Sequence, residues 1–463
     1  MEVFVYYRIL RFDALWDTTQ WITPAYVALD SKGMIAAVST TPAHDQPAER
    51  IAGFALPGYH NAHSHAFQYA MAGLAEHLPT HALEDDFWTW RETMYRLALT
   101  VSPDAMEDIA AMLYAQMAAC GYTSVAEFHY LHHDTNGYPY ENKAEMGQRL
   151  IAAAARAGIK ITLIPTFYQR GGFGKPAQPQ QRRFVSASVE DFFDLLESSR
   201  TAVSSADHAR LGVAVHSLRA ATAEDAQTIF SQADPTLIRH IHASEQQKEV
   251  DDCLAHLGER PVAWLLQHLP LDARYHLIHA THILDEEARA LAQSGAHVVL
   301  CPSTEGNLGD GFFPLRTFME ASGRWSIGTD SHIGIDLCEE LRWMDYVQRL
   351  RRQKRNRLCI HGDQDSGQIA LQYAIQNGRA ANGHTVPPFA IGQPLDAVVY
   401  DAHHPLLAAA PSERRLSTIV YASDACARLG TLVNGQWIVH HRQHRHQDAL
   451  RTAFLRTLHS LQA

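Results

Sequence analysis

Eight short apolar runs alternate with amphipathic segments through the middle of the chain, and this alternation limits the possible folds more than any other feature. The runs cover residues 51–57, 123–128, 161–167, 211–217, 238–243, 275–280, 296–301 and 325–329. Most are separated by stretches such as 104–119, in which apolar residues recur at helical spacing. Strands that alternate with helices pair in parallel through crossover connections, so eight such units predict an α/β fold, a (β/α)8 barrel of the TIM type.

The two ends of the chain have a different pattern. Residues 1–50 and 391–439 contain short strand-like runs with turns, and Asn434-Gly435 is a strong hairpin signal. Neither end has enough apolar residues for a core of its own, so we expect the two ends to pair. The sequence therefore predicts a small β-sandwich domain formed by residues 1–53 and 388–463, beside a barrel domain formed by residues 54–387.

Composition argues against several classes of partner. The formal net charge of −11 disfavours nucleic acid, and no stretch approaches the roughly 18 consecutive apolar residues of a membrane helix. The first residues lack the basic start and cleavage site of a signal peptide, and the six scattered cysteines indicate no disulfide framework. We therefore expect a cytoplasmic protein that acts on a small molecule, without nucleic-acid or membrane partners.

Side chains of metal-ligand type follow several of the predicted strands. His63 and His65 lie two residues apart after the first run, and such positions on a strand share a face. Three more runs lead into His242, His279 and Asp330. Because barrel active sites lie at the carboxyl ends of the strands, these side chains are expected to meet at one barrel mouth. Imidazole and carboxylate ligands with an open position for water are typical of catalytic zinc.

Two ligand assignments stay open at this point. His240 shares a strand face with His242, and His282 competes with His279. Glu245 lies three residues after His242 and can carry a proton between water and a leaving nitrogen, with His279 hydrogen-bonding the same water. No lysine ends the fourth strand, where a carboxylated lysine would bridge two metals, so we expect one metal ion per chain.

These residues resemble the metal sites of the amidohydrolase superfamily. Further segments are similar to the subgroup of that superfamily that deiminates formimino amino acids in histidine degradation, namely 63–68, 87–96, 216–219, 279–282, 301–311 and 329–332. The resemblance implies that one Zn²⁺ is bound by His63, His65, His242 and Asp330. It implies that the catalytic residues are Glu245, His279 and Asp330. The implied substrate-binding residues are Gln68, Arg91, Tyr130, His216 and Arg219.

The resemblance also implies a reaction, in which N-formimino-L-glutamate is hydrolysed to N-formyl-L-glutamate and ammonia. Arg91 and Arg219 would each bind one carboxylate of this substrate through a bidentate guanidinium. The sequence departs from the subgroup at Tyr69, where arginine is expected, at Val215, where proline is expected, and in a longer stretch at 77–84. These departures affect the substrate assignments and leave the metal site intact.

Other functions are compatible with the same residues. A deaminase of a nucleobase uses the same scaffold, although its pocket would favour stacking aromatics over paired arginines. Another formimino amino acid, such as formiminoaspartate, is a closer alternative. A catalytically inactive scaffold is disfavoured by the intact Glu245 and Asp330. The sequence leaves open the cellular metal, the principal proton carrier among Glu245 and His279, and the oligomeric state, for which we expect a homodimer.

Overall fold

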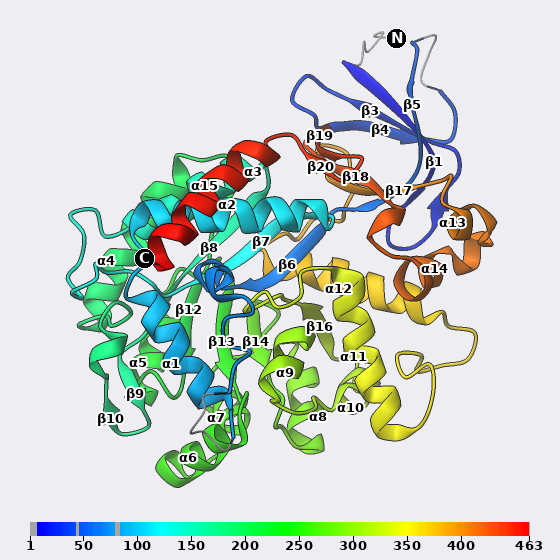
Figure 1. Ribbon diagram of the computed structural model, residues 1–463. Coiled ribbons are helices and arrows are strands. Elements are labelled where there is room, and N and C mark those ends of the chain that lie inside the picture. The colour runs from blue at the N-terminus through cyan, green and yellow to red at the C-terminus, as the bar shows by residue number, and fades with distance from the viewer. Residues whose placement is uncertain (1–6, 43–45, 79–83, 463) are drawn as a thin grey trace.

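The computed structural model describes residues 7–42, 46–78 and 84–462 (Figure 1). Residues 1–6, 43–45 and 463 of the predicted β domain lie outside the described part, and so do residues 79–83 of the divergent stretch. Among the described residues, no helix combines the length and apolar character needed to cross a membrane.

One sheet of the described chain is the barrel. Its strands are parallel and neighbour one another in chain order, as the alternation of strands and helices predicts. They are β6 (Tyr59–Ser64), β7 (Tyr122–His129), β8 (Lys160–Phe167), β12 (Val213–Ser217), β13 (Arg239–Ala243), β14 (Tyr275–His279), β15 (His297–Leu300) and β16 (Arg324–Ile327). The short β11 (Ala209–Leu211) pairs with β8 at one edge.

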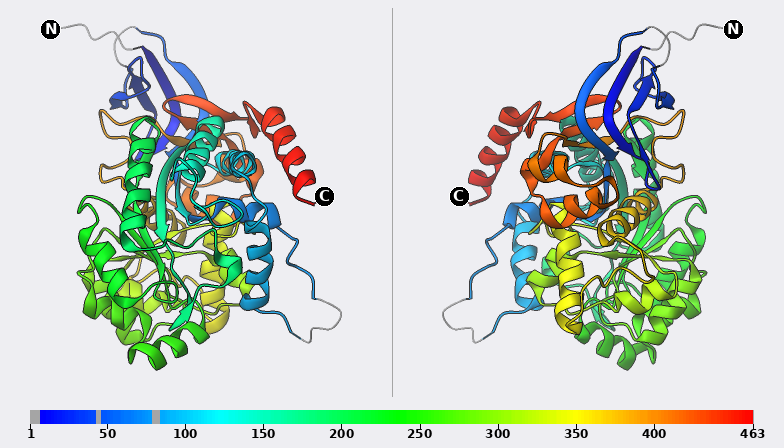
Figure 2. Two further views of the ribbon diagram at one scale, coloured as in Figure 1. Left: turned by 90° about the vertical axis from the view of Figure 1, so that its left-hand side faces the viewer. Right: turned by 90° about the vertical axis from the view of Figure 1, so that its right-hand side faces the viewer.

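Helices surround the barrel strands on the outside (Figures 1 and 2). In chain order they are α1 (Phe87–Ala98), α2 (Pro103–Ala119), α3 (Glu145–Ala157), α4 (Val189–Ser204), α5 (Ala223–Gln232), α6 (Gln247–Leu257), α7 (Pro261–His268), α8 (Asp285–Ser294), α9 (Pro302–Leu308), α10 (Leu315–Glu320), α11 (Leu337–Arg352) and α12 (Ser366–Ala381). Their buried faces and the strands form one continuous apolar core. The helical spacing in 104–119 is confirmed by α2, which begins at the Ser102 cap.

A second sheet joins the two ends of the chain. Its order is β20-β19-β18-β17-β5-β1-β3-β4, with β2 paired to β1. The strands are β1 (Arg8–Trp16), β2 (Trp21–Ile22), β3 (Ala25–Leu29), β4 (Ile35–Ser39), β5 (Glu49–Pro57), β17 (Ala397–Asp401), β18 (Arg428–Val433), β19 (Gln436–His440) and β20 (Gln443–His444). The sheet stands at one side of the barrel (Figure 2). Its separate apolar core draws on both ends, including Phe12 and Leu432, so the predicted fold class is confirmed.

Three further helices follow in the C-terminal part, α13 (Pro405–Ala409), α14 (Arg415–Ala422) and α15 (Gln447–Gln462). The last of these lies against α2 on the barrel side (Figure 1). There Tyr69 stacks on Phe454, with ring centroids 5.5 Å apart. The division into residues 1–53 with 388–463 and residues 54–387 stays a prediction.

The first predicted barrel strand was wrong. Residues 51–57 belong to β5, which pairs with β1 and β17 in the terminal sheet. The barrel begins two residues after Pro57, with the polar strand β6. The sequence of an apolar run does not show which sheet the strand joins. Strand β6 was not predicted, because its inward side chains are polar. His63 therefore lies on the barrel strand itself, while His65 precedes the short 3-10 helix Ala66–Met71.

The barrel closes between its first and last strands through a small set of hydrogen bonds. The carbonyl of His63 accepts from the backbone N–H groups of Thr329, at 3.0 Å, and Asp330, at 3.1 Å. The buried Asn61 side chain adds a bond to the Thr329 hydroxyl, at 2.7 Å, and accepts from the Thr329 N–H, at 3.1 Å. At Gly328 a Cβ would lie only 2.6 Å from the Cβ of His63. This close approach brings His63 and Asp330 to one place.

Replacing Asn61 by alanine should therefore weaken the closure. We expect the free energy of unfolding to fall by about 2–3 kcal/mol, because Thr329 would lose partners that buried polar groups need. Urea denaturation monitored by circular dichroism measures the change. The exposed Asn136 offers a matched control, whose replacement by alanine should shift stability by under about 0.5 kcal/mol. Equal losses from both variants would contradict a special role of Asn61.

Candidate active site

A cavity of about 410 Å³ opens at the carboxyl ends of the barrel strands. It is lined by most of the residues that the sequence singled out, and by aromatic and basic side chains from α1 and the loop after β8. The predicted residues among its lining are His65, Gln68, Arg91, Tyr130, His216, Arg219, His242, Glu245, His279 and Asp330. Of the predicted site residues only His63, which is fully buried, is not part of the lining.

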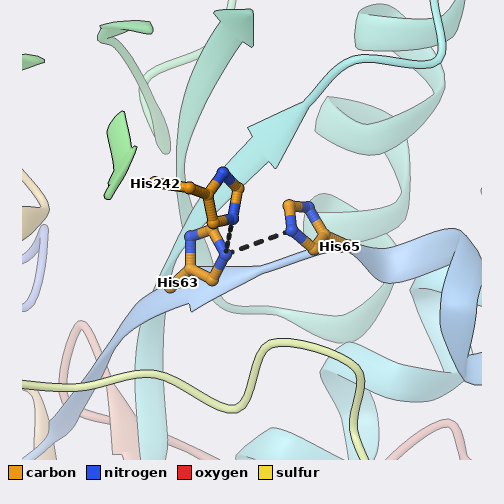
Figure 3. Close-up of side chains that lie close together, drawn as sticks. All are labelled: His63, His65 and His242. Atoms are coloured by element: carbon orange, nitrogen blue, oxygen red, sulfur yellow. Dashed lines mark hydrogen bonds between the residues drawn. The ribbon is translucent and has the colours of Figure 1, made fainter. Parts of the chain in front are cut away.

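Three histidines converge at the bottom of this cavity (Figure 3). The Nε2 atom of His63 lies 3.1 Å from the Nε2 atom of His65 and 3.1 Å from the Nε2 atom of His242. The Oδ1 atom of Asp330 lies 3.5 Å from His63 Nε2 and 3.3 Å from His65 Nε2. All four side chains are buried. The structure thus brings these four side chains together, and their role as metal ligands stays a prediction.

Hydrogen bonds on the far side of two rings decide which nitrogens face inward. His65 Nδ1 donates to the carbonyl of Phe128, and His242 Nδ1 donates to the carbonyl of His216, both at 2.9 Å. A neutral imidazole carries one proton, so both Nε2 atoms present lone pairs to the centre of the cluster. Burial lowers the pKa of His65 and His242 and lowers that of His63 to about 3, so the rings are neutral at pH 7.

Lone pairs and a carboxylate that face one another at these distances repel unless a cation lies between them. Nitrogen and carboxylate donors are the ligands that zinc takes in proteins, and backbone bonds to the other imidazole nitrogen are the usual supports of such ligands. The donor set of His63, His65, His242 and Asp330 therefore fits a zinc-type ion. Although burial acts to raise the pKa of Asp330, its contacts with His63 and His65 hold that pKa well below the usual range.

The backbone turns sharply where the last two of the site strands end. His279 has a φ of 67° and Asp330 has a φ of 46°, both in the left-handed region that non-glycine residues rarely adopt. Such conformations cost about 1–3 kcal/mol each and persist where surrounding contacts enforce them. Here they aim both side chains into the cavity, where His279 Nε2 lies 3.8 Å from Asp330 Oδ2.

Glu245 is held in an ion pair that the sequence did not reveal. Its Oε2 atom accepts from Nη2 of Arg219 at 2.9 Å, and its Oε1 atom lies 3.7 Å from Nε2 of His279. Arg219 also lies 3.8 Å from Glu249, whose carboxylate accepts from the backbone N–H groups of Ser244 and Glu245. Within the part of the chain that the structure describes, Nη1 of Arg219 is buried without a hydrogen-bond partner. One oxygen of Glu245 is thus fixed, and the other faces the cavity.

His279 is oriented by a carboxylate from the next strand end. Its Nδ1 atom lies 3.3 Å from Oε1 of Glu305, which also accepts from the backbone N–H of Cys301 at 2.9 Å. Burial alone would lower the pKa of His279, but the charge of Glu245 and the bond to Glu305 raise it to about 10. Glu305 was missed in the sequence, although it lies in one of the segments that carry the resemblance.

Glu127, a strand-end residue that was assigned no role from the sequence, supports the first histidine pair. Glu127 on β7 accepts from the Ser64 hydroxyl at 2.6 Å, the Ala66 N–H at 2.6 Å and the Tyr114 hydroxyl at 2.9 Å. These bonds hold the turn on which His65 lies. Burial raises the pKa of Glu127 to about 7, against the effect of the three donors. The feature of the sequence that could have indicated this role is a single acidic residue within an otherwise apolar strand.

The predicted substrate residues line the cavity above the histidines. Gln68 donates to the Tyr130 hydroxyl at 2.9 Å, and its Oε1 atom is buried and has no hydrogen-bond partner in the described residues. The His216 ring lies tilted against His242, with centroids 4.8 Å apart. Arg91 lies over the ring of Trp88, 4.5 Å from its centroid, and its buried Nε atom has no hydrogen-bond partner among residues 7–42, 46–78 and 84–462.

Arg170 is a third guanidinium at this cavity, and the sequence did not single it out. It begins the hairpin of β9 (Arg170–Gly172) and β10 (Lys175–Pro176), in the loop that follows β8. Its Nε atom is buried without a partner, and among the described residues neither Arg170 nor Arg91 has a carboxylate partner. Its place just after a barrel strand was the signal that could have found it.

The structure shows where the two alternative ligands, His240 and His282, and the divergent residues Val215 and Tyr69 lie. His240 points away from the cluster and bonds the Ala381 carbonyl at 3.1 Å, and His282 bonds the Asp310 carbonyl at 2.6 Å. Neither lines the cavity. Val215 is buried within β12, and Tyr69 faces α15, so neither of them lines the cavity either. Of the divergent stretch at 77–84, residues 79–83 lie outside the described residues.

Comparison with known proteins agrees with this geometry. A model of the amidohydrolase family matches residues 54–438. The formimidoylglutamate deiminase of Pseudomonas aeruginosa is 42% identical over 442 residues, which are 95% of this chain and 96% of that protein. A 5-methylthioadenosine/S-adenosylhomocysteine deaminase of Haloarcula marismortui is 24% identical over 90% of this chain and 86% of that protein.

Solved structures show the same fold. The crystal structure of an amidohydrolase from Brucella melitensis matches with a TM-score of 0.92 at 39% identity, covering 98% of this chain and all of that one. A zinc-bound adenosine deaminase from Xanthomonas campestris matches with a TM-score of 0.80 at 20% identity, covering 98% of each chain. The second similarity is evidence of fold alone.

Proposed function

The chain belongs to the amidohydrolase family, which is metal-dependent, and from this we propose that it hydrolyses N-formimino-L-glutamate to N-formyl-L-glutamate and ammonia with one zinc ion per chain. The similarity to a formimidoylglutamate deiminase over almost the whole chain supports the proposal. The observation that carries it is one cavity that combines the three-histidine cluster, Glu245 and two guanidinium groups without carboxylate partners.

We propose that the ion is held by His63, His65 and His242 through Nε2 and by Asp330. Zinc, when bound, lowers the pKa of a coordinated water to about 7 and so supplies hydroxide at neutral pH. The lone pairs at the cluster centre support this assignment, and so does the burial of all four groups. The fourth barrel strand, β12, contains no lysine that could be carboxylated to bridge two metals, which supports a single ion.

Glu245 is the proposed proton carrier. Its Oε2 atom is occupied by Arg219, so Oε1 is the atom that takes a proton from the attacking water and returns it to the departing nitrogen. His279 faces the same space through Nε2 while its Nδ1 atom is used by Glu305. It therefore serves as a fixed hydrogen-bond donor to the oxygen that gains negative charge during attack.

The two carboxylates of the substrate need two cationic partners. In the described part of the chain, Arg91 and Arg170 have no carboxylate partner, and Arg219 has a buried Nη1 atom that Glu245 does not contact. Gln68 and Tyr130 form a polar pair at the same wall. We propose that Arg91 and Arg219 bind the carboxylates, as the resemblance implies, and that Arg170 adds positive charge at the entrance.

The proposal is tested by ammonia release from a panel of formimino-L-glutamate, formimino-L-aspartate, adenine and guanine. Purified, zinc-loaded protein should act on formimino-L-glutamate with the highest kcat/KM. Preference for formimino-L-aspartate would keep the reaction and change the substrate, whereas preference for a purine would overturn the assignment. The cytoplasmic location and the lack of nucleic-acid and membrane partners stay predictions.

Replacing Glu245 by glutamine should abolish most turnover while one equivalent of zinc stays bound. Glutamine keeps the shape of the side chain but cannot carry the proton, and such help contributes roughly 10²–10⁴-fold. Steady-state kinetics and elemental analysis of the same preparations measure both quantities. Two equivalents of zinc in native protein would contradict the single-ion site. Near-full turnover of the variant would transfer the proton role to another group.

Two arginine variants should behave differently. Arg91→Met should lower kcat/KM on formimino-L-glutamate by roughly 30-fold to several-thousand-fold, equivalent to about 2–5 kcal/mol, and should spare a neutral formamidine. Arg219→Met should impair both substrates, because Glu245 loses its ion-pair partner as well. Lys175→Met, at an exposed position of the same cavity rim, is the control and should change little. Equal proportional losses on both substrates in Arg91→Met would show that Arg91 does not bind a carboxylate.

A further inference from the structure

Glu249 is a buried carboxylate close to Glu245, and neither the sequence prediction nor the proposed reaction gives it a role. It lies in the first turn of α6, the helix that follows β13 (Figure 1), and its side chain has no exposed surface. Acidic side chains are rarely buried unless hydrogen bonds or an opposite charge compensate for the loss of water. The groups that compensate for the burial of Glu249 therefore indicate what this residue does.

Both oxygens of Glu249 accept from the backbone just after β13. Oε1 accepts from the N–H of Ser244 and Oε2 accepts from the N–H of Glu245, each at 3.1 Å. Ser244 has a φ of 53°, in the left-handed region that non-glycine residues rarely adopt. The two hydrogen bonds hold this bend of the backbone, and the bend sets the direction in which the Glu245 side chain leaves the main chain.

The same carboxylate lies beside the Arg219 guanidinium. Oε2 of Glu249 is 3.8 Å from Nε of Arg219, while Oε2 of Glu245 accepts from Nη2 of Arg219 at 2.9 Å. Nε and Nη2 form one edge of the planar guanidinium, so the two carboxylates share that edge. Nη1 lies outside it and has no hydrogen-bond partner in the residues that the structure describes. The rotation of the guanidinium is thus set by two carboxylates together.

Capping of α6 does not explain these contacts. The N-cap residue is Gln246, whose side chain bonds Asp310 and makes no cap hydrogen bond. An acidic residue in the first turn does interact favourably with the helix dipole, but that effect requires neither burial nor a neighbouring arginine. Glu249 instead reaches past the cap to the backbone of Glu245. Burial raises the pKa of Glu249 and Arg219 opposes that rise, and two oxygens that both accept from N–H groups fit the ionised form.

We propose that Glu249 is a positioning residue for the reaction, which holds the backbone of Glu245 and fixes the rotation of the Arg219 guanidinium. Oε1 of Glu245 is thereby kept toward the cavity, and Nη1 of Arg219 is left for a carboxylate of the substrate. Glu249 does not line the cavity, so it acts through these two residues. The inference rests on the proposed function, in which Glu245 carries the proton.

Steady-state kinetics of zinc-loaded Glu249→Gln on formimino-L-glutamate and on a neutral formamidine test the proposal. Glutamine keeps the length of the side chain, but it loses the charge beside Arg219 and offers one acceptor oxygen to two N–H groups. We expect kcat to fall about 10- to 100-fold on both substrates, because a displaced Glu245 transfers the proton poorly in both reactions. The zinc content and the KM for the neutral formamidine should not change. Asp251→Asn, at an exposed position of α6, is the matched control and should change kcat by less than about 2-fold.

A double-mutant cycle shows whether Glu249 acts through Glu245. In a Glu245→Gln background, the added Glu249→Gln change should lower kcat by less than about 3-fold, since the proton carrier is already lost. A loss as large as in the native background, or native kcat in Glu249→Gln alone, would overturn the proposal. Full turnover of Glu245→Gln alone would overturn the proposed role of Glu245, and this inference with it.

Circular dichroism and zinc analysis of each variant show whether the fold is retained. If Glu249→Gln does not fold, Glu249→Asp takes its place in the same measurements. Its side chain keeps the charge beside Arg219 but is too short to reach both N–H groups, so kcat should again fall on both substrates. Native kcat in Glu249→Asp would then count against a positioning role.

Discussion

The lone pairs that meet at the barrel mouth are the constraint on which the rest of the site depends. His65 and His242 cannot turn their protons inward, because backbone carbonyls of neighbouring strand ends use them. With His63 and Asp330 beside them, four groups of donor type face one point in a buried space. A cation is the component that makes this arrangement stable, so the histidine cluster, the barrel closure and the strand-end conformations form one unit.

The closure between β6 and β16 is what gives that unit its geometry. His63 lies on the first barrel strand and Asp330 just after the last, more than 260 residues apart in the chain. They come together because the His63 carbonyl accepts from the backbone at 329 and 330 and because Gly328 has no side chain. Asn61 reinforces the same contact. A structural feature of the fold thus sets the distance between two of the proposed ligands.

The alternation of apolar runs and helical spacing was sufficient to predict the barrel and the joined chain ends. The residues that meet at the barrel mouth followed from the rule that barrel active sites lie at the carboxyl ends of the strands. The alternation failed at 51–57, because an apolar run has the same pattern in either sheet. Several contacts were beyond reach for a different reason. The pairing of Glu245 with Arg219, and of Glu127 with the turn before Ala66, depends on how side chains from separate strands pack. Local sequence patterns do not carry that information.

Arg219 links substrate binding and proton transfer, the two tasks that the proposal assigns to this cavity. Its Nη2 atom restrains Glu245, while its Nη1 atom is buried without a hydrogen-bond partner among the described residues. A carboxylate bound at Nη1 would share the positive charge and loosen the restraint on Glu245. Proton transfer through Oε1 would then be easiest when a substrate with the right carboxylate is in place. In this proposal one side chain binds the substrate carboxylate and also positions the proton carrier. Substrate specificity and catalytic rate then depend on the same residue, because binding energy from a remote part of the substrate acts at the reacting centre.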